Sequence, residues 1–250
     1  MTAQAPAREQ GPARDVRRTR PRGVLALRIL GWTLITTGAV VALYVVYALW
    51  FSDLGTQREQ AQLIEEWEAE LGPLEGLEVD EVDETPLEPD ATTPELDAGD
   101  DAAAPLDAGD AMAVLAFHRP GEDERPVNPN PLAVIEGVGV PQLQRGPGHY
   151  PGTTLPGEEG NFAVAGHRVT YARPFHNLEE IRPGDEVHVW DRSGARHVYE
   201  VVGTEIVHPS ETWVLGDDPL ETGRPTITLT TCHPKFSNRE RMIMFGELVE

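Results

Sequence analysis

The sequence contains very little cysteine and lysine. Cys232 is the only cysteine among 250 residues, so no intrachain disulfide can stabilise the fold. Lys235 is the only lysine, and arginine supplies the other nineteen basic side chains. No folded stretch is strongly basic, which argues against nucleic-acid binding. None of the eight histidines stands at a recognised zinc spacing from Cys232, so the sequence predicts no metal site, and it contains no cofactor motif.

Positive charge gathers at the N-terminus, and negative charge follows it. Residues 1–28 contain seven arginines and two acids, a net charge of +5. Residues 53–110 contain twenty acids and only Arg58 as a base, a net charge of −19, and residues 111–250 carry −8. The first of these stretches has no hydrophobic periodicity, so we expect a disordered basic tail there.

One long apolar run separates the basic tail from the acids. Residues 29–51 contain no charged side chain and are long enough to cross about 30 Å of hydrocarbon as a helix. Trp32 and Trp50 suit the two membrane interfaces, and the arginines on the N-terminal side predict a cytoplasmic N-terminus with the remainder outside. A cleaved signal peptide is the alternative, but the run is longer than a usual signal core and no small-x-small cleavage site follows it.

The acidic region that follows is predicted to be a linker. Residues 52–111 are rich in Pro, Gly and acids, and Leu-Asp-Ala-Gly-Asp occurs at 96–100 and again at 106–110. Such a composition buries too little apolar surface to offset the entropy of ordering, so we expect a disordered stalk. Residues 57–70 are the exception, because their apolar spacing predicts a short helix or an extension of the membrane helix.

From residue 112 the pattern changes to short apolar runs separated by Gly and Pro. About seven strands in roughly 140 residues predict a mainly β domain over 112–250, a closed or nearly closed barrel or a sandwich. Helical signal is limited to residues 175–181 and 211–215. The expected strands are 113–117, 132–135, 162–165, 186–190, 197–207, 226–232 and 241–249.

One of these strands ends at the single cysteine. Residues 226–234 are rich in β-branched side chains, and Pro234 prevents continuation as a central strand. This places the thiol of Cys232 at the rim of a sheet, on the same face as Thr228 and Thr230 by the two-residue period. Taken alone, a single cysteine is also consistent with a small buried hydrophobic residue.

A reactive thiol needs a base and a group that stabilises the oxyanion. His167 follows a buried strand that ends in Gly-His, so it would emerge at a sheet rim as Cys232 does. Arg239 and Arg241 open the final strand on one face, and either could reach a substrate carbonyl. Each also has a structural interpretation, because a histidine can cap a turn and an edge arginine is usually solvated.

The motifs together resemble the sortases, which are membrane transpeptidases of Gram-positive bacteria. The motifs that carry this resemblance are Ala-Gly-His-Arg at 165–168, Thr-Leu-Thr-Thr-Cys at 228–232 and an arginine nine residues after the cysteine. Gly-Pro-Gly-His-Tyr-Pro-Gly-Thr at 146–153 is similar to the segment before the family's catalytic histidine. Cys-x-Pro followed by Phe is most similar to class E of actinobacteria, with class D the near competitor.

The resemblance implies a role for each residue. It implies Cys232 as the nucleophile, His167 as the acid/base partner and Arg241 as the group that holds substrate and stabilises the oxyanion. The spacing from the cysteine favours Arg241 over Arg239. Thr230 and Thr231 are implied at the substrate-binding site, the latter beside the oxyanion. The implied fold is the sortase β-barrel, with 112–250 as the catalytic domain.

The function implied is that of a membrane-anchored cysteine transpeptidase. It would cleave a C-terminal Leu-Ala-x-Thr-Gly or Leu-Pro-x-Thr-Gly signal of a secreted protein through a thioacyl intermediate. The amine acceptor would be a lipid-linked peptidoglycan precursor or a pilin lysine. The alternatives are an L,D-transpeptidase or cell-wall cysteine peptidase, although Ser-His-Gly-Cys is absent, and a non-catalytic wall-binding β-domain with a buried thiol.

Overall fold

The computed structural model describes residues 22–74, 107–122 and 125–249. The chain forms two compact units, Met1–Ala48 and Leu49–Glu250, which are described separately. The elements in chain order are α1 (Arg22–Leu71), β1 (Ala111–His118), β2 (Leu132–Glu136), α2 (Val140–Arg145), β3 (Gly148–His149), β4 (Asn161–Ala165), η1 (Leu178–Glu180), β5 (Glu186–Asp191), β6 (Arg196–Val207), η2 (Trp213–Leu215), β7 (Thr226–His233) and β8 (Glu240–Leu248).

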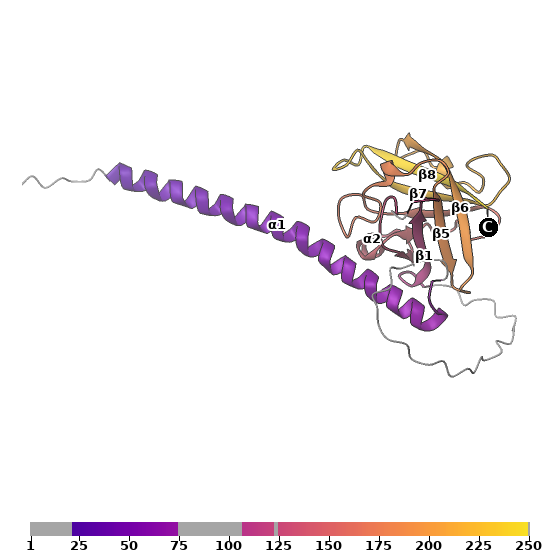
Figure 1. The fold of residues 1–250 in the computed structure, drawn as a ribbon. Helices are drawn as coiled ribbons and strands as arrows, with labels where there is room; N and C mark the ends of the chain where they lie inside the picture. Colours follow the sequence, from indigo (N-terminus) through magenta and orange to yellow (C-terminus); the bar gives the residue numbers. More distant parts are fainter. Residues whose placement is uncertain (1–21, 75–106, 123–124, 250) are drawn as a thin grey trace, which may run out of the picture. The chain divides into compact units, whose positions relative to one another are not determined.

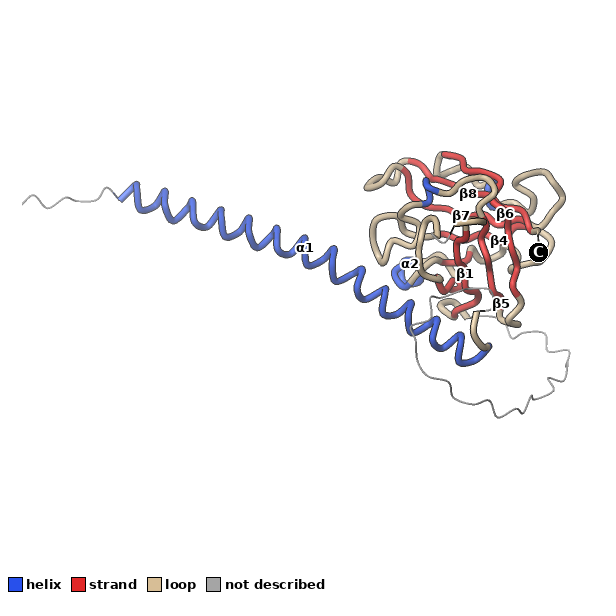
Figure 2. The backbone as a smooth tube through the Cα atoms, in the orientation of Figure 1, coloured by secondary structure: helices blue, strands red, loops and turns tan. Residues whose placement is uncertain are grey.

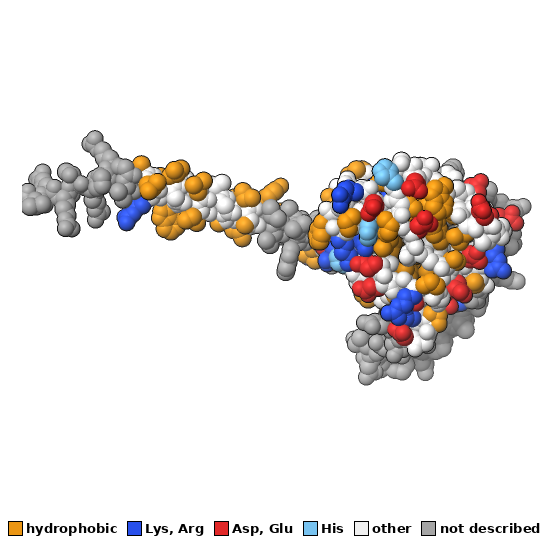
Figure 3. Space-filling view, turned by 90° about the horizontal axis from the view of Figure 1, so that it is seen from above, with side chains coloured by type: hydrophobic (Ala, Val, Ile, Leu, Met, Phe, Trp, Pro, Cys, Tyr) orange, Lys and Arg blue, Asp and Glu red, His pale blue; other side chains and the backbone are white. Residues whose placement is uncertain are grey.

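The first unit contains the N-terminal part of helix α1. The segment Leu25–Tyr44 is long and apolar enough to cross a membrane, by length and composition alone. Hydrophobic side chains dominate the surface of this part of the helix in Figure 3. The segment overlaps the span predicted at 29–51, whereas residues 1–21 of the predicted basic tail lie outside the described residues.

The second unit is built around a closed eight-stranded barrel (Figures 1 and 2). The strands follow the order β1-β2-β3-β4-β7-β8-β6-β5 around the barrel. The β2–β3 and β4–β7 pairs are parallel, and the other neighbours are antiparallel. Closure leaves no long unpaired edge, so every strand is hydrogen-bonded on both sides over part of its length. The predicted β-barrel is confirmed.

Inward-facing side chains fill the barrel. Phe117, Phe162, Tyr199, Ile227 and Leu229 are each at most 1% exposed and belong to one contiguous core. Because side chains alternate along a strand, the buried Ile227 and Leu229 of β7 point into this core, while Thr226, Thr228 and Thr230 face the other side. The cysteine end of β7 is therefore fixed by a packed interior.

The sequence missed two short elements and placed seven strands correctly to within a few residues. The strand β3 has only two residues, and α2 has six. Neither is long enough to show a period of hydrophobic residues. The helical signals at 175–181 and 211–215 correspond to the single-turn helices η1 and η2.

Helix α1 does not end where the acidic linker was predicted to begin. It continues through residues 53–71, and this stretch packs on the barrel. Trp67 is 5% exposed and lies in an apolar cluster with Val114 and Trp190 on the barrel's outer surface. The extension of the membrane helix predicted at residues 57–70 is therefore confirmed, whereas residues 53–56, which were predicted to belong to the disordered linker over 52–111, are also helical. Residues 75–106 of that linker lie outside the described residues.

A buried glutamine fixes the same helix to strand β2. Gln60 Nε2 donates to the carbonyl oxygens of Ala133 (3.1 Å) and Arg145 (3.0 Å), and Gln60 Oε1 accepts from the Ala133 N–H at 2.9 Å. Strand β3 pairs only with Ile135 and Glu136 of β2, so the amide of Gln60 completes β2 at Ala133 in place of a neighbouring strand. The side chain is 7% exposed, which makes these bonds costly to lose.

We therefore predict that Gln60→Leu lowers the free energy of unfolding by about 2–4 kcal/mol, because it leaves buried backbone groups without partners. Urea unfolding of the full-length chain in detergent, followed by near-ultraviolet circular dichroism, measures this. Gln57→Leu is the matched control, since Gln57 is exposed one turn earlier. It should change stability by no more than about 0.5 kcal/mol. Equal losses in the two variants would contradict the bridging role.

Candidate active site

Cys232, the nucleophile candidate, and Arg241, the arginine candidate, lie opposite each other on two adjacent strands. Strands β7 and β8 are antiparallel, and Cys232 is the register partner of Arg241. Both side chains are half-buried. Arg241 Nη1 donates to the carbonyl oxygens of Asn238 and Glu240, each at 3.0 Å. Arg239 precedes β8 and is exposed, so the strand register distinguishes two arginines that the two-residue period could not.

The histidine candidate reaches the same rim through a parallel strand pair. Ala165 of β4 is the register partner of Thr230 of β7, and the Gly166 N–H continues the ladder by donating to the Thr230 carbonyl at 3.0 Å. Two residues further along each parallel strand stand His167 and Cys232, respectively. The topology thus brings imidazole and thiol to the same level at the same end of the barrel.

Glycine is required just before the histidine. A Cβ on Gly166 would lie 2.5 Å from the ring of Phe175, a core residue. The Phe175 N–H in turn donates to the carbonyl oxygen of His167 at 3.2 Å. The Gly-His pair in the sequence therefore marks the place where the chain leaves β4 against a packed aromatic ring.

The imidazole of His167 stands in an aromatic, partly dry environment. Its ring centroid is 5.1 Å from that of Tyr171, with 39° between the planes. Burial disfavours the charged form and lowers the pKa of His167 below its usual 6.5. Within the described part of the chain, no hydrogen bond joins this ring to the thiol of Cys232, and the lowered pKa keeps the imidazole neutral at neutral pH.

The two threonines beside the nucleophile are buried and have protein partners. The Thr230 hydroxyl lies 3.0 Å from the hydroxyl of Tyr150. The Thr231 hydroxyl donates to the carbonyl oxygen of Gly166 at 2.7 Å. Thr231 therefore reinforces the β4–β7 junction that carries His167. A role for either residue in substrate binding stays a prediction.

Sequence reasoning overlooked the residues that hold the histidine loop. Tyr171, Ala172 and Arg173 all adopt left-handed backbone conformations, with φ of 51°, 58° and 51°. Such residues are costly unless their surroundings hold them. Asp53 of α1 accepts from the Ala172 N–H and forms an ion pair with Arg173, both at 3.2 Å. No local sequence pattern signals this contact, because its partners are about 120 residues apart.

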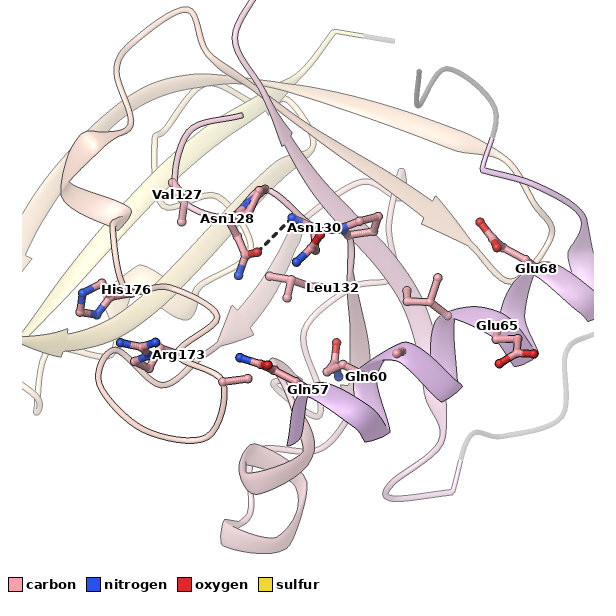
Figure 4. Close-up of a pocket in the computed structure, with 15 residues that line it drawn as sticks. Gln57, Gln60, Glu65, Glu68, Val127, Asn128, Asn130, Leu132, Arg173 and His176 are labelled. Carbon is pink, nitrogen blue, oxygen red and sulfur yellow. Dashed lines mark hydrogen bonds between the residues drawn. The ribbon is translucent and has the colours of Figure 1, made fainter. Parts of the chain in front are cut away.

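The same loop lines a cavity of about 720 Å³ beside helix α1 (Figure 4). Gln57 and Gln60 of the helix lie on one side, and Asn128, Arg173 and His176 lie on the other. Neither Cys232 nor His167 lines this cavity. It is therefore distinct from the rim where thiol, imidazole and guanidinium converge. Within residues 22–74, 107–122 and 125–249, no cluster of His, Cys, Asp or Glu suits a metal ion.

Comparison with known proteins identifies the family. A family model described as the sortase domain matches residues 128–249. Sortase SrtE2 of Streptomyces coelicolor is 31% identical over 242 residues, which cover 90% of this chain and 82% of that relative. The chain belongs to the sortase family. Its relatives include class E members, and the predicted resemblance is confirmed.

Two solved sortases share the fold. The SrtF sortase from Corynebacterium diphtheriae is 29% identical with a TM-score of 0.52, covering 64% of this chain and 92% of that one. Sortase C from Clostridium perfringens, solved with the C-terminal cell wall sorting motif, is 25% identical with a TM-score of 0.50 and covers 58% of this chain and 74% of that one. Sortases are cysteine transpeptidases, so this chain is an enzyme of that type.

The lowered pKa of His167 predicts how stability depends on pH. Between its folded pKa and 6.5, the unfolded chain binds more protons than the folded one. The stability that neutral His167 contributes is therefore present above pH 6.5 and is lost as the pH falls toward the folded pKa. His167→Gln should flatten the decline in unfolding free energy between pH 7 and pH 5, measured by urea titrations.

His188 provides an internal comparison for this measurement. Burial also lowers its pKa, in part opposed by a hydrogen bond to Glu186. His188→Gln should flatten the same decline by a separate amount, and the double variant should combine the two. A pH dependence unchanged by His167→Gln would show that its imidazole is not desolvated in the folded protein.

Proposed function

We propose that this sortase is a membrane-anchored class E transpeptidase, with Cys232 as nucleophile, His167 as acid/base and Arg241 as the oxyanion and substrate group. The observation that carries the proposal is the strand register. Parallel β4–β7 pairing brings His167 level with Cys232, and antiparallel β7–β8 pairing places Arg241 opposite the same cysteine. Three residue types that transpeptidation needs thus meet at one end of the barrel.

The first chemical step begins with a neutral imidazole on His167. The His167 imidazole takes the proton of the Cys232 thiol, and the sulfur attacks the carbonyl carbon of the threonine in the sorting signal. A carbon–sulfur bond forms, and the bond to the glycine nitrogen breaks. The imidazolium returns its proton to the departing amine. Because burial lowers the pKa of His167, its protonated form readily gives up this proton.

The second step reverses the proton path. An amine attacks the thioacyl carbon, the imidazole accepts the proton that the attacking nitrogen loses, the carbon–sulfur bond breaks, and the imidazolium passes the proton to the departing sulfur. The products are a new amide and the starting enzyme. The acceptor we propose is a lipid-linked peptidoglycan precursor or a pilin lysine, each of which offers a primary amine near the membrane face.

Arg241 is suited to the oxyanion that forms in both steps. Its Nη1 bonds to carbonyl oxygens of the β7–β8 connection, which anchors the guanidinium. Its Nε and Nη2 have no partner among the described residues, so they remain available for a substrate oxygen. Arginine presents several donors in a fixed plane, which suits a carbonyl oxygen that becomes negatively charged.

The proposed substrate is a secreted protein with a C-terminal Leu-Ala-x-Thr-Gly or Leu-Pro-x-Thr-Gly signal. The sortase C of Clostridium perfringens, which was solved with the C-terminal cell wall sorting motif, supports a signal of this kind. Helix segment Leu25–Tyr44 is the proposed anchor, with the basic tail in the cytoplasm and the barrel outside. Anchoring raises the effective concentration of enzyme and membrane-held substrates.

The decisive test is a joining assay with the full-length chain in detergent. Peptides with each of the two signals are incubated with a small primary amine, and the joined product is measured by mass spectrometry. Wild type should join at least one peptide and carry a transient thioacyl adduct on Cys232. Cys232→Ala should abolish both the joined product and the thioacyl adduct. His167→Ala should reduce kcat at least 100-fold. Joining by Cys232→Ala would overturn the mechanism.

A matched pair of arginine variants tests the third group. Arg241→Ala should lower kcat/KM by about 10²–10³, as expected when an oxyanion donor is removed. Arg239→Ala should stay within about threefold of wild type, a free-energy change of about 0.7 kcal/mol, because its side chain is exposed and precedes the strand. Reversed effects would assign the oxyanion role to Arg239.

A further inference from the structure

Arg168 is an unusual residue to find buried. It directly follows His167 and is 3% exposed. Its Nε is buried and has no hydrogen-bond partner among the described residues. A buried guanidinium with an unpaired donor costs stability, and exceptions of this kind concentrate at functional sites. The reason for its burial is therefore to be sought in its other contacts.

Those contacts lie on the nucleophile's strand. Arg168 Nη1 donates to the carbonyl oxygen of Cys232 at 3.1 Å and lies 3.0 Å from Nδ1 of His233. Because arginine can only donate, Nδ1 of His233 is the acceptor and its proton resides on Nε2. The side chain of Arg168 thus holds the main-chain carbonyl group of Cys232 and the side chain of the residue that follows it.

A carboxylate fixes the other arm of the guanidinium. Arg168 Nη2 donates to Glu179 at 2.8 Å, and Lys235 bonds to the same carboxylate at 2.6 Å. Burial opposes ionisation of Glu179, but hydrogen bonds from Lys235, its own backbone and Arg168 outweigh it and lower the pKa to about 2. The carboxylate stays charged at neutral pH and balances the buried cation.

The main chain of Arg168 is also held. Its carbonyl oxygen accepts from Nδ1 of His176 at 2.7 Å, one turn before η1. The last backbone hydrogen bond between β4 and β7 runs from Gly166 to Thr230. Beyond that bond, the Thr231 hydroxyl still reaches the Gly166 carbonyl oxygen, and the guanidinium of Arg168 then links the segment that carries His167 to the carbonyl group of Cys232.

We propose that Arg168 is a positioning residue that sets the separation of His167 and Cys232, by joining the residue after the base to the carbonyl group of the nucleophile. The inference rests on the proposed function, since it assigns Arg168 to that reaction without contact with substrate. Lysine cannot replace it, because one ammonium cannot reach a carbonyl, an imidazole and a carboxylate with a planar fork.

The test compares Arg168→Lys with Arg119→Lys in the full-length chain. Arg119 is a matched control, because it also bonds to a carboxylate (Asp185, 2.7 and 2.9 Å) and to a carbonyl oxygen (Glu180, 3.0 Å). None of these residues lies at the candidate active site. Melting temperatures are measured first, and kinetics are recorded where each variant is fully folded.

Arg168→Lys should lower kcat at least tenfold while KM stays within threefold of wild type, because the buried side chain does not meet substrate. Arg119→Lys should leave both constants within twofold, whatever its melting temperature. Glu179→Gln should have a smaller effect than Arg168→Lys, since it leaves the bond to Cys232 in place. A kcat of Arg168→Lys within threefold of wild type, or an equal loss in Arg119→Lys, would overturn the proposal.

A second readout separates this proposal from the proposed function. The rate at which iodoacetamide alkylates Cys232 depends on the imidazole accepting the thiol proton, not on peptide joining. Arg168→Lys should slow alkylation at pH 7 at least threefold, and Arg119→Lys should not. If wild type joins neither peptide, the proposed function fails, while the alkylation rates still decide the role of Arg168. Equal rates in all three proteins would reject it.

Discussion

The parallel pairing of β4 with β7 is the constraint on which the site depends. Parallel strands bring equivalent ends of two distant segments to one edge, so His167 after β4 and Cys232 in β7 come to the same end of the barrel. An antiparallel pairing would place them at opposite ends. The adjacent antiparallel strand β8 adds Arg241 as the register partner of Cys232. Sheet topology thus brings the three residues to one rim, and the loop after β4 decides how the imidazole stands there.

This pairing is short, and its open end has to be held by other groups. Beyond Ala165, the chain turns away from the ladder into three consecutive left-handed residues. Contacts from three different elements hold that turn: Asp53 of α1, Gln144 of α2 and Thr231 of β7. The loop that carries the base is therefore costly in itself and stable only in the assembled domain, a common arrangement at active sites.

Much of this architecture is predictable from periodicity, and the remainder is not. The β-branched run before Cys232 and the Gly-His step after a buried strand each report a local backbone state, so both rim positions follow from sequence. Arg241 could not be separated from Arg239 by the two-residue period, because both occupy one face. The resemblance favours Arg241 by its spacing from Cys232, and the strand register makes the same choice independently, because Arg241 is the pairing partner of Cys232. Pairing between segments is a tertiary property that periodicity does not contain.

Contacts between distant segments explain where the structure differs from what the sequence predicts. The apolar spacing of residues 57–70 predicts a helix, but the acidic composition around it does not predict that this helix packs on the barrel. Gln60 nevertheless fills a gap that the two-residue strand β3 leaves beside Ala133, and Trp67 covers the outer face of β1. One well-placed amide and one indole outweigh the charge of the segment, since desolvated hydrogen bonds and aromatic burial depend on position rather than composition.

The resting site is assembled but not yet polarised, and its parts explain why. Partial burial keeps His167 neutral, and no hydrogen bond within the described residues commits its ring to Cys232. The charged groups nearby are either buried in their own network, as Arg168 with Glu179, or held at the rim, as Arg241. In the proposed mechanism, the thiol proton therefore moves to the neutral imidazole only as the sulfur bonds to a substrate carbonyl, and the oxygen of that carbonyl becomes the anion that Arg241 binds.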